Sequence, residues 1–477
     1  MIYEFKRTMF YEIQEALSSD RAIFLLGPRK CGKTVCLKQI SEQIPDTVYV
    51  DIKQEDEDAV IDLIDNVISS IRTDEKITYL LDEVTYMPFP EKTIARIANE
   101  LTSSPGRNTR VVFAGSQSVA IKTWGRRAFG GFAKFVCTDF LTYPEWLAYK
   151  GRKDITEKSY NDFISGTREF YGDFESLDEY LRGCIDETVL SNLKSSNVLF
   201  GNKAEKLDAA FLKTLMYATL ISLQDRPVQK TFFDRDMLFK TIRYSLKEHY
   251  RKLGMDNVLQ RIDGIFRERF IEYTSTDIDV IRQGLVFLCN CGLITVCSVT
   301  GETVKYENIV DAYKDLSADL SEAHYRTKAD IFQNINISVN YPMFYVEILK
   351  DILGEYMPDK LPGDILGGIV ECHVRGILPK KGSYEYHNNE NENEVDYVNF
   401  LKEMAVEISI RDKRIVETHF ADLDPKYEKL LLGKTITDDT SEIKRLPYYS
   451  FIYGNSVPEP LLKKLAFSGK QKGGDCR

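Results

Sequence analysis

The sequence has no apolar run long enough to cross a bilayer. The longest, such as residues 22–26 and 285–289, fall far short of the roughly 20 residues that a spanning helix needs. The opening stretch, MIYEFKRTMF, also lacks the long apolar core of a secretory signal. From these absences we expect a cytoplasmic protein with no membrane partner.

An excess of positive charge is missing too. The formal net charge is −10, with 63 Lys and Arg against 73 Asp and Glu. Unspecific attraction to nucleic acid depends on clustered Lys and Arg, so this balance argues against it as the main property of the chain. The basic stretch 243–252 is more typical of a solvated helix face than of a DNA-binding surface, but it keeps DNA open as a candidate partner.

Regular cysteine spacing is the third absence. The nine cysteines include Cys289, Cys291 and Cys297, which share one parity in a strand-like region, but no histidine accompanies them at metal spacing. We interpret them as small buried hydrophobic residues in a reducing compartment and not as a zinc site.

Short apolar runs alternate with helical patterns through residues 1–143. Short strands that are apolar throughout are typical of parallel strands buried on both faces. The runs are 22–26, 47–52, 78–82, 110–115 and 134–138, with helical patterns at about 33–44, 56–72 and 91–103. This alternation predicts a doubly wound α/β fold with a parallel sheet.

The character of the chain changes after Tyr143-Pro144, and its 477 residues suggest about three domains. Residues 144–255 predict a helical domain. Residues 256–315 predict a winged-helix-like region with a turn at Gly292 and a strand pair near Gly301. Residues 316–467 mix helices and strands again in an α/β domain, and residues 468–477 predict a disordered tail.

A glycine-rich segment follows the first predicted strand. It fits G-x-x-x-x-G-K-[ST] and consists of Gly27, Pro28, Arg29, Lys30, Cys31, Gly32, Lys33 and Thr34. The two glycines let backbone N–H groups curl around phosphate oxygens, and Lys33 can reach the outer phosphates. The Thr34 hydroxyl can ligate Mg²⁺, while the helix that begins here points its positive end at the phosphates. The segment predicts a P-loop that binds ATP with Mg²⁺.

Two carboxylates end the strand at 78–82. Asp82 can hold Mg²⁺ through water, and Glu83 can orient and polarise the attacking water. Because another strand lies between the two motifs in sequence and a carboxylate follows Asp82, the pattern favours the ATPase branch with a catalytic glutamate. The alternative is an acidic surface pair without a catalytic role.

The fourth strand and the segment after it supply two further candidates. Ser116, or Gln117 as second choice, stands where a polar side chain would reach the γ-phosphate or its water. Arg126 or Arg127 could enter the site of a neighbouring subunit as an arginine finger, which makes a homo-oligomer a candidate assembly. An ordinary strand-to-loop turn and a solvated basic turn are the alternatives.

These motifs together resemble those of prokaryotic AAA-type ATPases fused to a C-terminal domain with restriction-endonuclease-like, PD-(D/E)xK features. The matching segments are the P-loop, 80–83, 115–118, 125–126 and the leucine-x-x-x-Glu-aromatic-leucine pattern at 141–147. The resemblance is specific over about residues 20–150, weak through 150–310, and returns at 367–371, 393–398, 405–409 and 445–452.

The resemblance implies a metal site in the C-terminal domain. Such a site needs carboxylates from a helix and a hairpin, here Glu371, Asp396 and Glu407, and a lysine that positions the water. The lysine position carries Ser409, which supplies no charge. We therefore expect a degenerate, metal-free or weakly catalytic domain, with an active nuclease as the alternative.

Three functions remain open. The first is a magnesium-dependent ATPase whose nuclease-like domain recognises a partner without cutting it. The second is an ATP-regulated DNA nuclease, against which Ser409 argues. The third is a nucleotide-gated interaction protein with negligible turnover, against which Glu83 argues.

Overall fold

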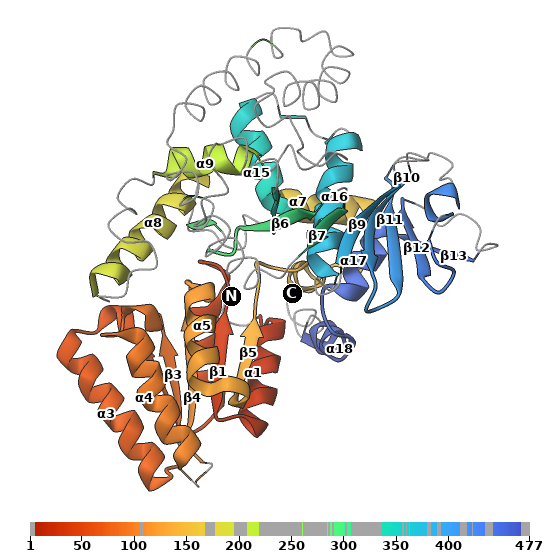
Figure 1. Cartoon of the computed structure of the whole chain (residues 1–477). Helices are drawn as coiled ribbons and strands as arrows, with labels where there is room; N and C mark the ends of the chain where they lie inside the picture. The colour runs from red at the N-terminus through yellow and green to blue at the C-terminus, as the bar shows by residue number, and fades with distance from the viewer. Residues whose placement is uncertain are drawn as a thin grey trace, which may run out of the picture.

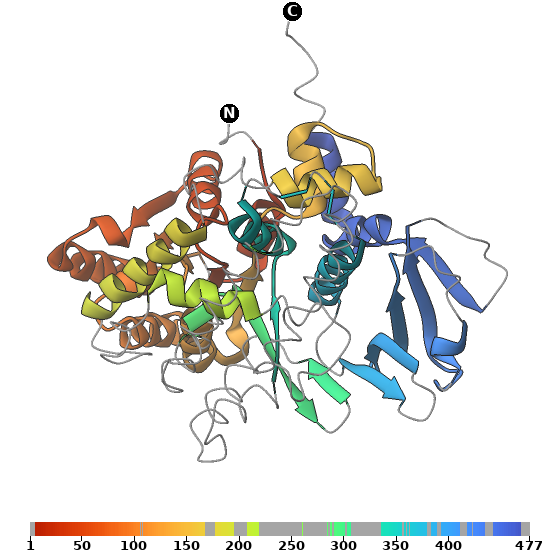
Figure 2. The same cartoon turned by 90° about the horizontal axis from the view of Figure 1, so that it is seen from above.

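The computed structural model describes most of the chain as two sheet-centred parts joined by helices. The described residues are 5–166 apart from positions 105 and 107, then 177–194, 208–218, 291–300, 303–306 and most of 335–468, with a few single residues between 260 and 288. The first sheet lies at the lower left of Figure 1 and the second at the upper right. In Figure 2, helices α15 (Pro342–Leu353) and α16 (Gly363–Ile377) lie between the two parts.

The first sheet is entirely parallel, with the strand order β2-β3-β4-β1-β5. Its strands match the predicted runs to within one residue at each end: β1 (Ala22–Leu26), β2 (Thr47–Asp51), β3 (Thr78–Asp82), β4 (Arg110–Gly115) and β5 (Ala133–Cys137). The expected parallel α/β fold is therefore confirmed. Strand β4 lies between β1, which leads into the glycine-rich loop, and β3, which carries the acidic pair.

Helices cover both faces of this sheet because successive residues of a strand point to opposite sides. Ile23 and Leu25 of β1 pack on the side of α1 and α2, whereas Phe24 and Leu26 pack on the side of α3, α4 and α5. Helices α1 and α5 add to the three expected ones. The five helices are α1 (Thr8–Ser19), α2 (Lys33–Gln43), α3 (Glu57–Thr73), α4 (Pro90–Ser103) and α5 (Ser118–Phe129).

The second sheet is mixed, with the order β13-β12-β11-β10-β9-β7-β6-β8. Pairing is parallel among β11, β12 and β13 and antiparallel elsewhere. The strands are β6 (Ile294–Thr300), β7 (Thr303–Tyr306), β8 (Ile335–Val339), β9 (Ser383–Asn388), β10 (Asn393–Asn399), β11 (Met404–Ile408), β12 (Glu428–Gly433) and β13 (Ile443–Pro447).

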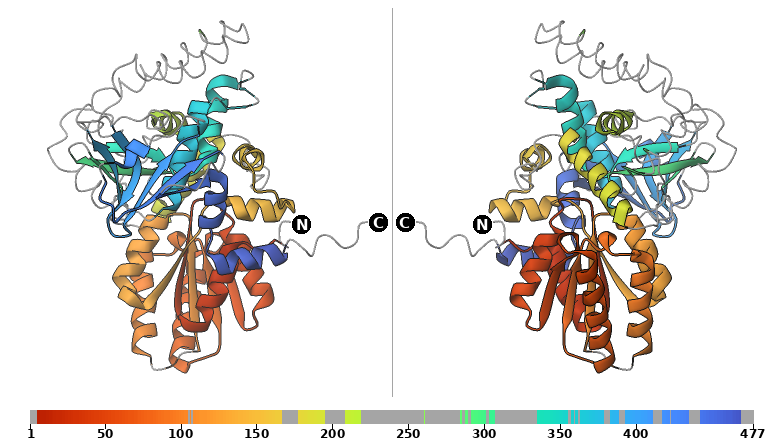
Figure 3. Two further views of the ribbon diagram at one scale, coloured as in Figure 1. Left: turned by 90° about the vertical axis from the view of Figure 1, so that its right-hand side faces the viewer. Right: turned by 90° about the vertical axis from the view of Figure 1, so that its left-hand side faces the viewer.

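One hydrophobic cluster connects the two parts, while the two faces of the parallel sheet pack in clusters of their own. A single cluster of buried residues begins with Phe5, includes Cys31 of the glycine-rich loop and extends to Leu465. Helix α18 packs on α1 and α6, as the left view in Figure 3 shows for α18 and α1. The remaining helices are α6 (Tyr143–Lys150), α7 (Glu157–Gly166), α8 (Leu177–Lys194), α9 (Ala209–Ala218), α17 (Tyr448–Asn455) and α18 (Glu459–Ser468).

The strand pair expected near Gly301 is present as β6 and β7, but these strands belong to the second sheet, where β7 pairs with β9. The basic stretch 243–252, Cys289 and the tail 469–477 lie outside the described residues, as do most residues expected to form the helices of a winged helix. The winged helix and the domain boundaries therefore stay predictions. Of the helices described, none is long and apolar enough to cross a membrane.

Candidate nucleotide site

The predicted phosphate-binding residues meet at one edge of the parallel sheet. Leu26 at the end of β1 is in register with Gly115 of β4 and Cys137 of β5. The residues that follow these strands, Gly27 among them, therefore leave the sheet at the same level. Glu83 follows β3 at this edge, so the glycine-rich loop and the acidic pair face one common space.

Both glycines of the loop are required by its geometry. A β-carbon at Gly27 would lie 2.5 Å from the carbonyl oxygen of Thr138 and 2.8 Å from the Cys31 sulfur. Gly32, the N-cap of α2, has a φ of 91°, a backbone conformation that residues other than glycine rarely adopt. The loop thus curls tightly from β1 into the first turn of α2.

The side chain of Lys33 lies within this curl. It is 4% exposed, and its Nζ donates to the carbonyl oxygens of Gly27, at 2.9 Å, and Pro28, at 2.8 Å. Ser118, at the start of the helix α5 that follows β4, bonds the loop from the side. Its Oγ accepts from the Gly27 N–H at 2.8 Å and donates to the Gly27 carbonyl at 3.1 Å. The ammonium group therefore lies inside the loop, bonded to two of its carbonyl groups.

The acidic pair is held in a defined geometry. Asp82 is 1% exposed and accepts hydrogen bonds from the Tyr49 hydroxyl at 3.2 Å and from the Glu83 N–H at 3.1 Å. Glu83 has a left-handed backbone with a φ of 52°, which costs a non-glycine residue about 1–3 kcal/mol. A β-carbon on Gly115 would lie 3.7 Å from Glu83 Oε2. The strained turn directs the Glu83 carboxylate toward the end of β4.

Negative charge accumulates beside Asp82. Asp51 is in register with Asp82 on the neighbouring strand, and burial, followed by the Asp82 charge, raises the pKa of Asp51. Burial and the same aspartate also raise the pKa of Tyr49. A divalent cation would relieve this repulsion, and a threonine hydroxyl with a carboxylate is an oxygen donor set that suits Mg²⁺. The oxygen donors of Thr34 and Asp82 are of the type that Mg²⁺ prefers, and their role in holding the ion stays a prediction.

Other predicted residues lie beyond the loop and the acidic pair. Ser116 and Gln117 are buried in the turn from β4 into α5, and their role toward a γ-phosphate stays a prediction. Arg126 and Arg127 are exposed in the last turn of α5, about 12 Å along the helix from Ser118 at its start. Arg127 pairs with Glu91 at 3.0 Å. The two arginines therefore lie at the end of α5 that points away from the loop.

Ser118, Tyr49 and Asp51 were not among the expected site residues. Their positions relative to the predicted strands could have indicated each of them. Tyr49 and Asp51 share one parity in the strand next to β3, and Ser118 opens the helix after β4. Ser118 stands two residues after the expected Ser116, and its side chain bonds the glycine-rich loop.

The loop, the strand order and the acidic pair agree with a family match. Residues 19–139 match a family model described as an AAA domain. This segment is an AAA-type P-loop domain. A search of curated proteins found no match to the chain.

Several solved structures resemble this chain at a distance. A Walker-type ATPase of Pyrococcus abyssi is 15% identical, with a TM-score of 0.32, covering 66% of this chain and 96% of that one. AMPPCP-bound DnaA of Aquifex aeolicus is 14% identical, with a TM-score of 0.27, covering 55% and 93%. The Aeropyrum pernix ORC1 protein in complex with DNA is 10% identical, with a TM-score of 0.24, covering 73% and 93%. The assignment rests on the family match and the loop itself.

The three C-terminal carboxylates lie around an arginine. Arg375 of α16 pairs with Glu371 one turn earlier on the same helix, and its Nη2 lies 3.6 Å from Asp396 Oδ1. Its Nε donates to the Asp396 carbonyl at 3.1 Å. Glu407 accepts from the Asp396 N–H at 3.4 Å and contacts His419 at 3.0 Å. The helix and the hairpin thus bring the carboxylates together with a guanidinium between two of them.

This arrangement does not suit a metal ion. Within the described part of the chain, no group of three or more His, Cys, Asp or Glu residues is placed to hold one. Arg375 already supplies a positive charge to Glu371 and Asp396. Ser409 follows β11 directly, and its N–H donates to the Leu432 carbonyl at 2.8 Å. The residues implied as metal ligands are therefore an internally paired cluster here.

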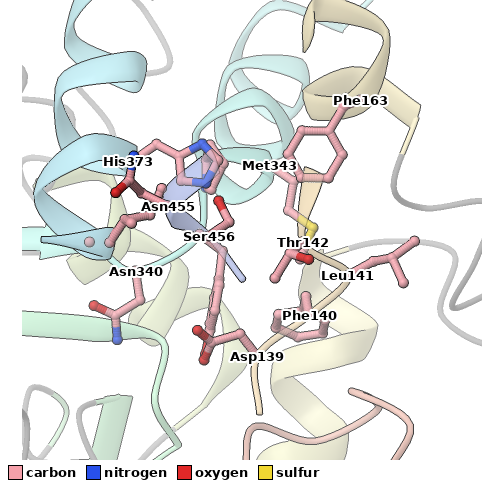
Figure 4. Close-up of a pocket in the computed structure, with 14 residues that line it drawn as sticks. Asp139, Phe140, Leu141, Thr142, Phe163, Asn340, Met343, His373, Asn455 and Ser456 are labelled. Carbon is pink, nitrogen blue, oxygen red and sulfur yellow. The ribbon is translucent and has the colours of Figure 1, made fainter. Parts of the chain in front are cut away.

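A cavity of 240 Å³ lies where the segment after β5 meets the C-terminal helices (Figure 4). Its wall includes Asp139, which accepts from the Tyr341 hydroxyl at 2.8 Å, and the ring of His373. Burial lowers the pKa of His373 to about 3. The hydroxyl of Tyr160, whose own pKa is raised by burial, forms a hydrogen bond of 2.8 Å with His373 Nδ1. The imidazole is therefore neutral at physiological pH.

Proposed function

We propose that this chain binds Mg–ATP in its AAA-type domain and hydrolyses it. The observation that carries the proposal is the joint placement of Lys33 and Glu83 at one sheet edge. Lys33 lies buried inside the glycine-rich curl. Glu83 follows the magnesium-type aspartate in a strained turn directed at the end of β4.

The roles follow from the chemistry of each side chain. Backbone N–H groups from Arg29 onward and the start of α2 would hold the phosphates, with Lys33 as the mobile cation. Thr34 and Asp82 would hold Mg²⁺, which when bound neutralises charge that develops on the phosphates. Glu83 would orient and polarise the attacking water as a general base. Arg29, Lys30 and Cys31 shape the loop between its two glycines.

The exposed Arg126 supports a proposal about assembly. An arginine that acts on ATP must come within contact of the phosphates, and this one lies at the far end of α5 from the loop of its own chain. We infer that, if it is catalytic, it acts on the site of a second copy. Activity would then depend on a homo-oligomer.

For the C-terminal part, the proposal is recognition without cleavage. Arg375 supports it by pairing with Glu371 and Asp396, and Ser409 supports it by supplying no charge. The nuclease alternative needs a metal among these carboxylates, which the guanidinium disfavours. DNA stays a candidate partner of this nuclease-like part.

An ATPase assay with and without linear double-stranded DNA, followed by a gel of that DNA, tests the whole proposal. The wild type should hydrolyse ATP and leave the DNA intact. Lys33→Ala should lose affinity for Mg–ATP in calorimetry, because the variant lacks the mobile cation of a loop whose other phosphate-binding donors are fixed backbone N–H groups. Lys92→Ala is the matched control, since Lys92 is an exposed lysine of the same domain that lies over the ring of Phe89.

Glu83→Gln separates binding from turnover. The amide keeps the shape of the side chain but loses the basic carboxylate, so ATP should bind and hydrolysis should slow by at least about 100-fold. Unchanged affinity in folded Lys33→Ala would remove the nucleotide site from the proposal. Wild-type turnover by Glu83→Gln would remove Glu83 from catalysis, and binding without turnover by the wild type would favour the nucleotide-gated alternative.

A further inference from the structure

The carbonyl groups of the glycine-rich loop accept hydrogen bonds from its own lysine and from side chains elsewhere in the chain. Lys33 and Ser118 bond the first two carbonyls, those of Gly27 and Pro28. Two later carbonyls are bonded by residues that the nucleotide motif does not contain. Arg7 bonds the carbonyl of Cys31, and Tyr180 bonds that of Arg29.

Arg7 reaches the loop from the N-cap of α1. It is 4% exposed, and besides the Cys31 carbonyl it donates to the Phe140 carbonyl at 3.0 Å and pairs with Glu145 at 2.8 Å. Glu145, in the first turn of α6, is fully buried. Burial alone would raise the pKa of Glu145, but Arg7 and the N–H groups of Thr142 and Thr8 outweigh it and hold that pKa below its usual value. The carboxylate therefore stays charged and fixes the guanidinium.

Tyr180 reaches the loop from α8. Its side chain is fully buried in the shared hydrophobic cluster, and its hydroxyl donates to the Arg29 carbonyl at 3.1 Å. The same helix passes close to the Arg29 side chain, since a β-carbon on Gly183 would lie 2.2 Å from Arg29 Nη1. Helix α8 also contacts residues 84–86, directly after Glu83.

Each of these contacts fixes the direction of a peptide group. In a trans peptide the C=O of one residue and the N–H of the next point in opposite directions. A hydrogen bond to the Cys31 carbonyl therefore turns the Gly32 N–H away from Arg7. A hydrogen bond to the Arg29 carbonyl likewise turns the Lys30 N–H away from Tyr180. Backbone N–H groups directed inward are what a phosphate-binding nest requires.

We propose that Arg7 and Tyr180 are positioning residues for nucleotide binding, which hold the phosphate-binding loop in its competent shape through its carbonyls. Neither side chain needs to touch the nucleotide. If either contact is removed, the loop samples other shapes, and the apparent dissociation constant rises as the competent fraction falls. The inference rests on the proposed ATP binding.

The two contacts also tie the loop to the rest of the chain. Arg7 joins it through Glu145 to α6. Tyr180 joins it to α8, whose Asp178 pairs with the buried Lys213 of α9 at 2.6 Å, and Lys213 in turn pairs with Asp351 of α15 at 3.1 Å. Movement of these helices would therefore change how well the loop binds phosphate, and nucleotide binding would in turn favour one position of the helices.

The experiment compares two tyrosines of the same cluster by calorimetry with Mg–ATP and Mg–ADP. Tyr160→Phe is the matched control for Tyr180→Phe, because Tyr160 is equally buried but bonds His373 and not the loop. Both variants lose one buried hydrogen bond and should lose similar thermal stability without nucleotide. Only Tyr180→Phe should bind both nucleotides more weakly, by about three- to tenfold, with kcat at saturating ATP nearly unchanged.

Arg7→Lys tests the second contact while keeping the charge opposite Glu145. A lysine can pair with the carboxylate but cannot also reach two separate carbonyls, so the dissociation constant should rise by about tenfold for ATP and ADP alike. A folded wild type that binds no nucleotide would defeat the proposed function itself. If the wild type binds and Tyr180→Phe matches Tyr160→Phe in affinity, the positioning role is wrong for Tyr180. Wild-type affinity in folded Arg7→Lys would show the same for Arg7.

Discussion

His373 should make the chain less stable in mild acid, by an amount that follows from its burial. In the fold its pKa is lowered to about 3 because burial disfavours the charged ring. In the unfolded chain the ring titrates near 6.5. The folded pKa is depressed, so its contribution to stability is complete above about pH 6.5 and is lost as the pH falls toward about 3. At about pH 5.5, protonation of this ring in the unfolded chain lowers the free energy of unfolding by about 1.4 kcal/mol, because the ring in the folded chain stays neutral.

The assay is thermal unfolding at about pH 7.5 and about pH 5.5 for the wild type and for His373→Gln. Glutamine does not titrate, so the unfolding midpoint of the wild type should fall by about 1–2 °C more than that of the variant on acidification. Tyr160→Phe serves as the control, since it removes the hydrogen bond to Nδ1 but leaves the imidazole ring in place. That variant should be less stable at both pH values and keep the wild-type pH dependence. Equal acid sensitivity of the wild type and His373→Gln would refute the reasoning.

Three further outcomes are expected. Ser118→Ala should weaken Mg–ATP binding by about five- to tenfold in calorimetry, because the Gly27 N–H loses its acceptor; unchanged affinity would contradict this. A mixture of the Arg126→Ala and Glu83→Gln proteins should regain part of the ATPase activity that each protein lacks alone, because a mixed interface contains one intact site. Full ATPase activity of a strictly monomeric Arg126→Ala protein would rule out an arginine finger that acts in trans. The wild type should leave linear DNA uncut on a gel with ATP and Mg²⁺, and cutting that Asp396→Ala abolishes would show that the C-terminal part is an active nuclease despite Ser409.

The sheet and the loop were predictable because local sequence decides them. Each strand of the parallel sheet is short and largely apolar, and its boundaries agree with the predicted ones to within one residue. The glycine-rich loop has a fixed spacing because only glycine fits beside Thr138 at position 27 and readily adopts the φ at position 32. Such constraints act over a few residues, so they are visible in the sequence.

What escaped prediction depends on contacts between distant residues. Arg7 and Glu145 are separated by 138 positions, and Tyr180 and Arg29 by 151. Nothing in the local pattern around an isolated arginine or tyrosine says which carbonyl it will bond. Arg375 is a sharper case, because it stands one helical turn after Glu371 and pairs with it. The spacing was visible in the sequence, but its meaning depended on where Asp396 lies.

The contact of α18 with α1 has a consequence for the order of assembly during synthesis. Lys464 of α18 lies over the ring of Tyr11 in α1 at 5.3 Å, and Leu465 belongs to the same cluster as Cys31. Translation at about 5–20 residues per second separates these two helices by tens of seconds. Throughout that interval the nascent chain carries α1 and the glycine-rich loop without the helix that later packs on α1. The ring of Tyr11 therefore stays without its Lys464 partner until residues 459–468 have been made.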